Sequence, residues 1–113
     1  MKHQILCSQC LDCRLGPLGW LSLETDDAPG NLGLHDQYLA LLWIHRHITV
    51  FGGDPDNVTL MGVSAGAMSI MCHLVSPYSG AGLFHKIIAL SGSCSTTLMH
   101  NDRQALIQYF FLI

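Results

Sequence analysis

The chain has 113 residues, of which 50 % are apolar and 12 % are charged, and its formal net charge is −3. This length is sufficient for one small domain, and the slightly acidic balance argues against nucleic acid or an anionic membrane as the main partner. Soluble domains are typically about 25 % charged, so this composition is more typical of the buried elements of a larger protein. No apolar run approaches the roughly 18 residues of a membrane-spanning helix.

The N-terminal stretch MKHQILCSQCLDC contains Cys7, Cys10 and Cys13 in a C-x2-C-x2-C pattern. Ferredoxin iron–sulfur sites continue this pattern with a fourth cysteine, but Pro17 stands there, and no second ligand pair follows at zinc-finger spacing. We therefore expect free thiols, no metal and no cofactor. The stretch also lacks the apolar core of a signal peptide, so the targeting sequence of a secreted or endoplasmic-reticulum parent would lie outside this chain.

Residues 14–34 contain glycines and two prolines among apolar residues, which predicts a structured loop region. The sequence DQYLALLWIHRHITVF, which begins at Asp36, has apolar residues at intervals of four. This pattern predicts a helix that is buried over much of its circumference and ends at Gly52-Gly53.

Two short apolar runs follow, at residues 58–61 and 86–90, and both are typical of buried parallel strands. Between them, residues 65–76 are predicted to form a helix that ends near Pro77. The order helix, strand, helix, strand favours parallel strands joined by crossover helices, which is the α/β fold class. The tail DRQALIQYFFLI is predicted to begin another helix.

A Gly-x-Ser-x-Gly motif, formed by Gly62, Ser64 and Gly66, lies between the predicted strand and helix. This is the context of a nucleophile elbow, in which glycines allow a turn where side chains would collide. The hydroxyl of Ser64 would project from the sheet edge, and the N–H of Ala65 at the helix N-terminus would donate to an oxyanion. The alternative is a phosphate-binding connection, but neither a P-loop lysine nor a G-x-G-x-x-G pattern is present.

Beyond this motif, the sequence from APGNLGLHDQ to KIIALSGS resembles the central segment of type-B carboxylesterases, the cholinesterase-like branch of the α/β-hydrolases. The shared motifs are GN-x-GL-x-DQ, FGGDP, VT, G-x-SAG, HL-x-SP, GLF and SGS, and RLGPLGWLS resembles the stretch just upstream. The resemblance covers residues 14–95. Residues 1–13 and 96–113 are therefore expected to be atypical ends without an independent domain.

The resemblance implies a partial α/β-hydrolase fold with few parallel strands. It also implies that Ser64 is the nucleophile, that the Ala65 N–H contributes to the oxyanion hole, and that Gly62 and Gly66 form the elbow. The implied reaction is attack of Ser64 on a small-molecule ester, formation of an acyl-enzyme and hydrolysis by water, without a cofactor.

The sequence departs from the family pattern at three places. Val63 stands where many members carry Glu, which argues against a cholinesterase more than against an esterase. CSQCLDC replaces an expected apolar strand, and no HGG run of the oxyanion loop is present. The family's acid and histidine lie downstream of this chain, and His73 would be about 13 Å along the helix from Ser64.

We therefore expect an internal piece of a serine carboxylic-ester hydrolase that is inactive as this chain. His45 and His47 are expected to lie at the surface or in satisfied core positions, and the local pair of His100 and Asp102 does not reproduce the separate acid and base loops of the fold. The alternative is a non-catalytic cholinesterase-like interaction protein, against which the retained Ser64 argues. The sequence carries no signal for an oligomeric state.

A smaller signal is the N-x-T pattern at Asn57-Val58-Thr59. It allows N-glycosylation of Asn57 if a parent protein enters the secretory pathway. The simpler interpretation, which we favour, is that Asn57 shapes the turn after Asp54-Pro55-Asp56.

Overall fold

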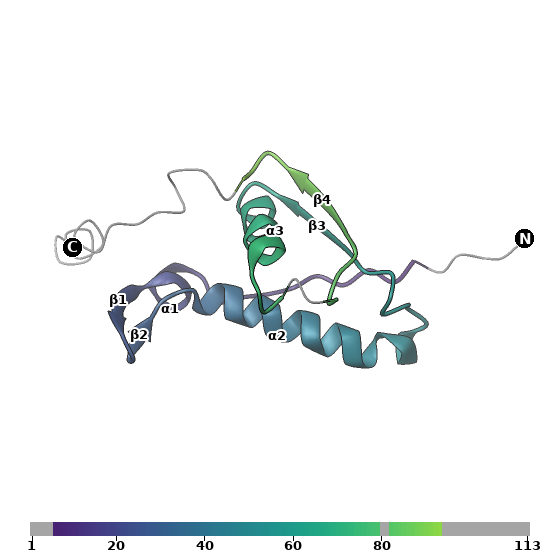
Figure 1. Ribbon diagram of the computed structural model, residues 1–113, viewed down its shortest axis with the longest axis horizontal. Helices are drawn as coiled ribbons and strands as arrows, with labels where there is room; N and C mark the ends of the chain where they lie inside the picture. Colours follow the sequence, from purple (N-terminus) through teal and green to yellow (C-terminus); the bar gives the residue numbers. More distant parts are fainter. Residues whose placement is uncertain (1–5, 80–81, 94–113) are drawn as a thin grey trace, which may run out of the picture.

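The structure is a computed structural model and describes residues 6–79 and 82–93. Its elements in chain order are helix α1 (Gly16–Trp20), strands β1 (Ser22–Thr25) and β2 (Ala28–Pro29), helix α2 (Leu32–His47), the 3-10 turn η1 (Ile48–Phe51), strand β3 (Thr59–Val63), helix α3 (Ala65–Val75) and strand β4 (Lys86–Leu90). In Figure 1, α2 lies along the base, α1 and the β1–β2 hairpin lie at one end of it, and β3, α3 and β4 lie above it.

Strands β3 and β4 form a parallel pair, in register from Thr59 opposite Lys86 to Val63 opposite Leu90. Helix α3 connects them, as the predicted strand–helix–strand order requires. Strand β4 has the predicted bounds, and β3 begins one residue later than expected and extends to Val63. The structure thus confirms an α/β arrangement with few parallel strands.

Each of these two strands has one half-buried face and one exposed face. Gly62 belongs to the half-buried face, where it lies close to the Ile70 side chain of α3. The opposite face holds exposed Thr59 and Lys86 and four apolar side chains that are 45–67 % exposed. They are Met61, Val63, Ile88 and Leu90. An apolar side chain stabilises the folded state only when it is removed from water, so these four side chains contribute little to the stability of β3, α3 and β4.

Helix α2 begins at Leu32, before the predicted start at Asp36. Asn31 precedes it in the left-handed region, at φ +57°, and Gly52 at φ +80° ends the following 3-10 turn. Asp36 therefore lies inside α2, and its carboxylate pairs with the Arg14 guanidinium. The Arg14 Nη2 to Asp36 Oδ1 distance is 2.7 Å, and the Arg14 Nε and backbone N–H groups donate to Oδ2.

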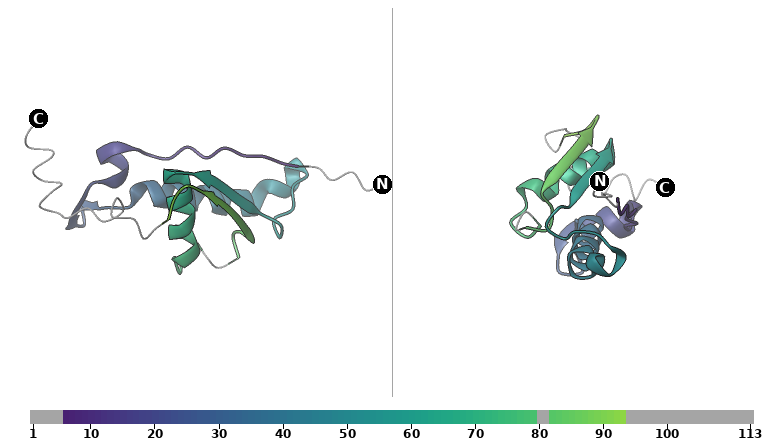
Figure 2. Two further views of the ribbon diagram at one scale, coloured as in Figure 1. Left: turned by 90° about the horizontal axis from the view of Figure 1, so that it is seen from above. Right: turned by 90° about the vertical axis from the view of Figure 1, so that its right-hand side faces the viewer.

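These hydrogen bonds from Arg14 lower the pKa of Asp36 to about 2. The carboxylate therefore stays charged at neutral pH and fastens the segment before α1 to the first half of α2. This extended segment lies alongside α2 and runs in the opposite direction, as Figures 1 and 2 show.

The prediction that residues 14–34 form only a loop was wrong, because they contain α1 and the β1–β2 hairpin. Pro17 lies in the first turn of α1, where its missing N–H costs no helical hydrogen bond. Gly30 lies against Ser22, and an added Cβ would be 2.8 Å from the Ser22 Cβ. Glycines and prolines therefore mark the ends and the close contacts of these short elements.

The predicted burial of α2 was also wrong for the described residues. Leu41 is 1 % exposed and Ile48, in η1, is 5 % exposed, but Leu39 and Trp43 are 60 % and 47 % exposed. Trp43 contacts the rings of His47 and Phe51, at centroid distances of 5.0 and 6.0 Å. The apolar pattern therefore predicted the helix correctly, but the prediction that most of the helix surface is buried was wrong. In the part of the chain that the structure describes, no helix is long and apolar enough to cross a membrane.

Candidate active site

Ser64 lies between Val63, the last residue of β3, and Ala65, the first residue of α3. Its backbone has φ +54° and ψ −117°, a combination that residues with a Cβ rarely adopt. The motif predicted that the glycines would carry the strained turn, but neither Gly62 nor Gly66 has a positive φ. The strained residue is the serine itself.

Two hydrogen bonds fix the backbone of Ser64. Its N–H donates to the Leu90 carbonyl of β4 at 2.9 Å, and its carbonyl accepts from the Met68 N–H of α3 at 3.0 Å. The side chain is exposed and does not cap α3. The hydroxyl is therefore presented at the carboxyl end of β3, where ligands bind in open parallel sheets.

The two glycines of the motif differ in their surroundings. An added Cβ at Gly62 would lie 2.6 and 2.7 Å from the carbonyl carbon and oxygen of Gly66, and 2.9 Å from the Ile70 Cδ1. An added Cβ at Gly66 would meet no described atom within 4 Å. The predicted steric reason therefore holds for Gly62 and was wrong for Gly66.

Ala65 is exposed and occupies the first position of α3. At this position the backbone N–H has no acceptor within the helix and lies at the positive end of the helix dipole. The Ser64 hydroxyl and the Ala65 N–H thus belong to the same exposed turn.

His73 is buried, at 5 % exposure, and links three parts of the structure. Its Nδ1 is 2.9 Å from the Ser79 Oγ, and its Nε2 is 3.0 Å from the Gln37 Oε1 on α2. It is therefore a hydrogen-bonded core histidine, not a partner of Ser64. His45 and His47 are exposed on α2, and His100 and Asp102 lie outside the described residues.

Burial lowers the pKa of His73 from its ordinary value of 6.5. The unfolded chain therefore takes up a proton at a pH where the folded chain keeps His73 neutral, so this residue's contribution to stability falls as the pH drops below 6.5. We expect the difference in free energy of unfolding between wild type and His73→Gln to shrink from about pH 8 to about pH 5. Urea unfolding of the wild type and the variant at several pH values measures this difference, and a difference that is independent of pH would contradict this prediction.

A groove of about 660 Å³ is lined by the N-terminal segment, α2, β3 and α3. Leu6, Cys7 and Cys10 form part of it, but Ser64 is not among its lining residues. Cys7, Cys10 and Cys13 are free thiols. Among the residues with described positions, no group of three or more His, Cys, Asp or Glu side chains is arranged to hold a metal ion.

Sequence reasoning missed the residues that follow β4. An added Cβ at Gly92 would lie 2.4 Å from the carbonyl oxygen of Ser64. Together with the hydrogen bond from Ser64 to Leu90, this contact places the end of β4 directly against the serine. The signal in the sequence for this contact is Gly92 within the Ser91-Gly92-Ser93 motif.

Comparison with protein families matches residues 10–110 to the carboxylesterase family. Acetylcholinesterase 4 of Caenorhabditis briggsae is 54 % identical over 101 residues, which are 89 % of this chain and 16 % of that protein. Bile salt-activated lipase of Mus musculus is 51 % identical over 79 residues, which are 70 % of this chain and 13 % of that protein.

Among solved structures, a thermophilic PNB esterase is similar with a TM-score of 0.68 and 51 % sequence identity, over 73 % of this chain and 17 % of that chain. This likeness confirms the predicted partial α/β-hydrolase fold. The chain spans 16 % and 13 % of the length of the two curated relatives. It belongs to the carboxylesterase family.

Proposed function

We propose that Ser64 is the nucleophile of a carboxylic-ester hydrolase that acts on small-molecule esters. The observation that carries this proposal is the strained backbone of Ser64 at a turn from strand to helix, with its hydroxyl exposed beside the Ala65 N–H. Residues held in such a conformation cluster at active sites, because the surrounding structure must maintain them.

In the proposed reaction, the Ser64 Oγ attacks the ester carbonyl carbon while its proton passes to a base. The carbonyl oxygen becomes negatively charged, and the Ala65 N–H donates a hydrogen bond to it. The C–O bond to the alcohol then breaks, and the alcohol leaves with a proton. Water attacks the resulting acyl-serine, which releases the acid and restores the Ser64 hydroxyl.

We further propose that this chain works as the central segment of a longer polypeptide and does not hydrolyse esters by itself. The hydrogen bonds of His73 engage both of its ring nitrogens, so it is not available as the base. The exposed apolar face of β3 and β4 and the exposed Leu39 and Trp43 of α2 also favour further covering elements.

A fluorophosphonate probe, which labels activated serines, tests this proposal. We expect a label on the peptide that contains Ser64 when the complete polypeptide is treated, and no label on the isolated 113-residue chain. Mass spectrometry of the tagged peptide and of its intact carrier distinguishes the two. A labelled chain of 12.4 kDa would overturn the requirement for further elements, and an unlabelled complete polypeptide would favour the non-catalytic alternative.

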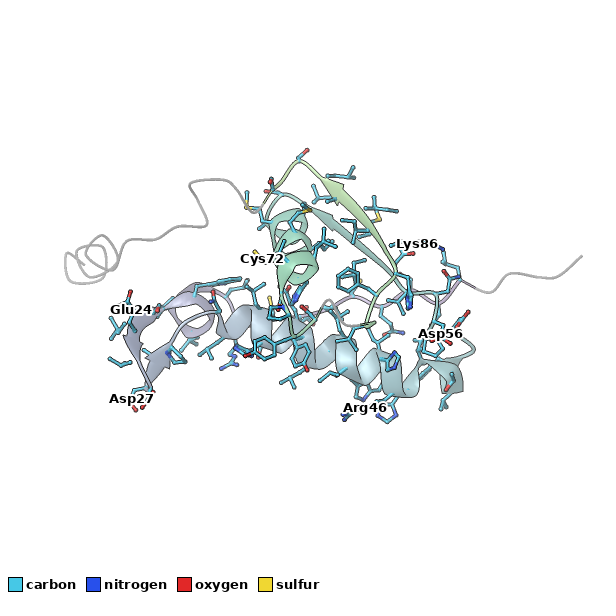
Figure 3. The ribbon with its side chains drawn as sticks, viewed as in Figure 1. Glu24, Asp27, Arg46, Asp56, Cys72 and Lys86 are labelled. Carbon is cyan, nitrogen blue, oxygen red and sulfur yellow. The ribbon has the colours of Figure 1, made fainter. Side chains whose placement is uncertain are left out.

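We also propose that Asn57 shapes the turn that begins at Asp54 and can in addition carry an N-linked glycan when the polypeptide passes through the secretory pathway. Asn57 is exposed, its backbone N–H closes the turn onto the Asp54 carbonyl at 3.2 Å, and its Oδ1 accepts from the Lys86 Nζ at 2.7 Å. Lys86 begins β4, whereas Ser64 follows the end of the parallel strand β3. A glycan would therefore lie at the opposite end of the sheet from Ser64, near the labelled Asp56 and Lys86 in Figure 3.

Thr59→Ala is expected to prevent this glycosylation, because it removes the hydroxyl of the N-x-T pattern and leaves Asn57 and its contact with Lys86 in place. The measurement is the mass lost on peptide N-glycosidase treatment of the complete polypeptide secreted from eukaryotic cells. The control is Thr25→Ala, another exposed threonine, in β1. Wild-type protein without any loss of mass would refute the glycosylation site and leave the turn as the role of Asn57.

A further inference from the structure

The contact between Gly92 and Ser64 requires a glycine for reasons of space. An added Cβ at Gly92 would lie 2.4 Å from the Ser64 carbonyl oxygen, 3.0 Å from the Ala67 Cβ and 3.2 Å from the Met68 Cγ. Gly92 does not have a positive φ, so its backbone conformation does not demand glycine. The 2.4 Å contact is to a backbone atom, and a backbone atom cannot move aside as the end of a flexible side chain can.

The oxygen in this contact belongs to the peptide unit that joins Ser64 to Ala65. A peptide unit is planar and trans, so its C=O and N–H move together. Any displacement of the Ser64 oxygen therefore tilts the Ala65 N–H as well. The residues after β4 thus touch the same rigid unit whose N–H is the oxyanion donor in the proposed reaction.

We propose that Gly92 is a positioning residue for this peptide unit. It allows the chain after β4 to pass against the Ser64 carbonyl, so that the Ser64–Ala65 peptide keeps the orientation in which its N–H points toward the developing oxyanion. Hydrogen bonds to Leu90 and Met68 hold the backbone N–H and carbonyl of Ser64, and glycine at position 92 leaves both bonds undistorted. This inference rests on the proposed esterase function of Ser64.

The test is Gly92→Ala in the complete polypeptide, with hydrolysis of 4-nitrophenyl acetate as the assay. A misdirected oxyanion donor weakens transition-state binding and leaves substrate binding nearly unchanged, so we expect kcat to fall by about 10²-fold and KM to stay within about threefold. The matched control is Gly82→Ala. Gly82 has φ +85° and no described atom within 4 Å of an added Cβ, so this variant strains the backbone without touching Ser64.

We expect Gly82→Ala to keep the wild-type kcat even where its melting temperature falls as far as that of Gly92→Ala. Equal losses of kcat in the two variants would show a merely structural role and overturn the proposal. A kcat of Gly92→Ala within about threefold of wild type would also overturn it.

A second readout separates this inference from the proposed function. If the wild-type polypeptide hydrolyses the ester no faster than the Ser64→Ala variant, the esterase proposal fails. The inference that Gly92 positions the Ser64–Ala65 peptide is then tested by hydrogen exchange at the Met68 N–H. This N–H donates to the Ser64 oxygen that Gly92→Ala would displace. We expect roughly tenfold faster exchange there in Gly92→Ala and unchanged exchange at Leu41 in α2. Unchanged exchange at Met68 would overturn the inference whatever the activity.

Discussion

Ser64→Ala is expected to lower the kcat of the complete polypeptide on 4-nitrophenyl acetate by about 10⁵- to 10⁶-fold, the scale on which removal of a nucleophile acts in serine hydrolases. The substitution removes the oxygen that would form the acyl-enzyme and leaves Ala65 and the helix N-terminus in place. Steady-state hydrolysis measures the loss, and fluorophosphonate labelling of the Ser64 peptide should disappear with it.

Ser8→Ala is the control for this experiment, because Ser8 is also exposed but lies in the extended segment before α1. It should retain the wild-type kcat. If Ser64→Ala kept more than about a tenth of the activity, another residue would have to be the nucleophile, since no residual catalysis by an oxyanion hole reaches that level.

Gly62→Ala and Gly66→Ala are expected to change stability in opposite directions. The methyl group at Gly62 meets the backbone of Gly66 and the Ile70 side chain at less than 3.0 Å, so strand and helix must separate. We expect a loss of about 3 kcal/mol, at the upper end of the range for overpacking, because backbone atoms cannot yield. The methyl group at Gly66 meets no described atom and should stabilise α3 by roughly 0.5–1 kcal/mol.

Thermal or urea unfolding of the complete polypeptide measures both changes. The pair is matched in chemistry, since each variant adds one methyl group two residues from Ser64. A destabilisation by Gly66→Ala as large as that by Gly62→Ala would mean that elements outside the described residues pack against Gly66.

The elements around Ser64 could be predicted from the sequence because short apolar runs there end at glycine or serine and begin after polar residues. Lys86–Leu90 lies between His85 and Ser91-Gly92, and the structure gives this strand the predicted bounds. The hairpin of β1 and β2 was missed because its strands are too short to show an alternating pattern, and its turn has only the exposed pair Asp26 and Asp27 as a signal.

The candidate site was predictable in part. The G-x-S-x-G pattern located Ser64 between a strand and a helix, and the structure places it there. The strained φ of Ser64 and its contacts with Leu90 and Gly92 depend on residues that are distant in the sequence. A local pattern carries no information on such contacts. For the same reason the apolar pattern of α2 predicted a helix correctly but could not tell which of its faces would be covered.

The parallel pairing of β3 and β4 has a consequence for the order in which the protein folds. Thr59 pairs with Lys86 across one intervening helix, so both strands of the pair and the helix between them lie within residues 59–90. Contacts that are close in sequence form early, and chains fold from the N-terminus during synthesis. We therefore expect β3, α3 and β4 to assemble while the ribosome is still adding residues. Until later segments arrive, the bare Met61, Val63, Ile88 and Leu90 would make this intermediate a ligand for chaperones that bind apolar surface.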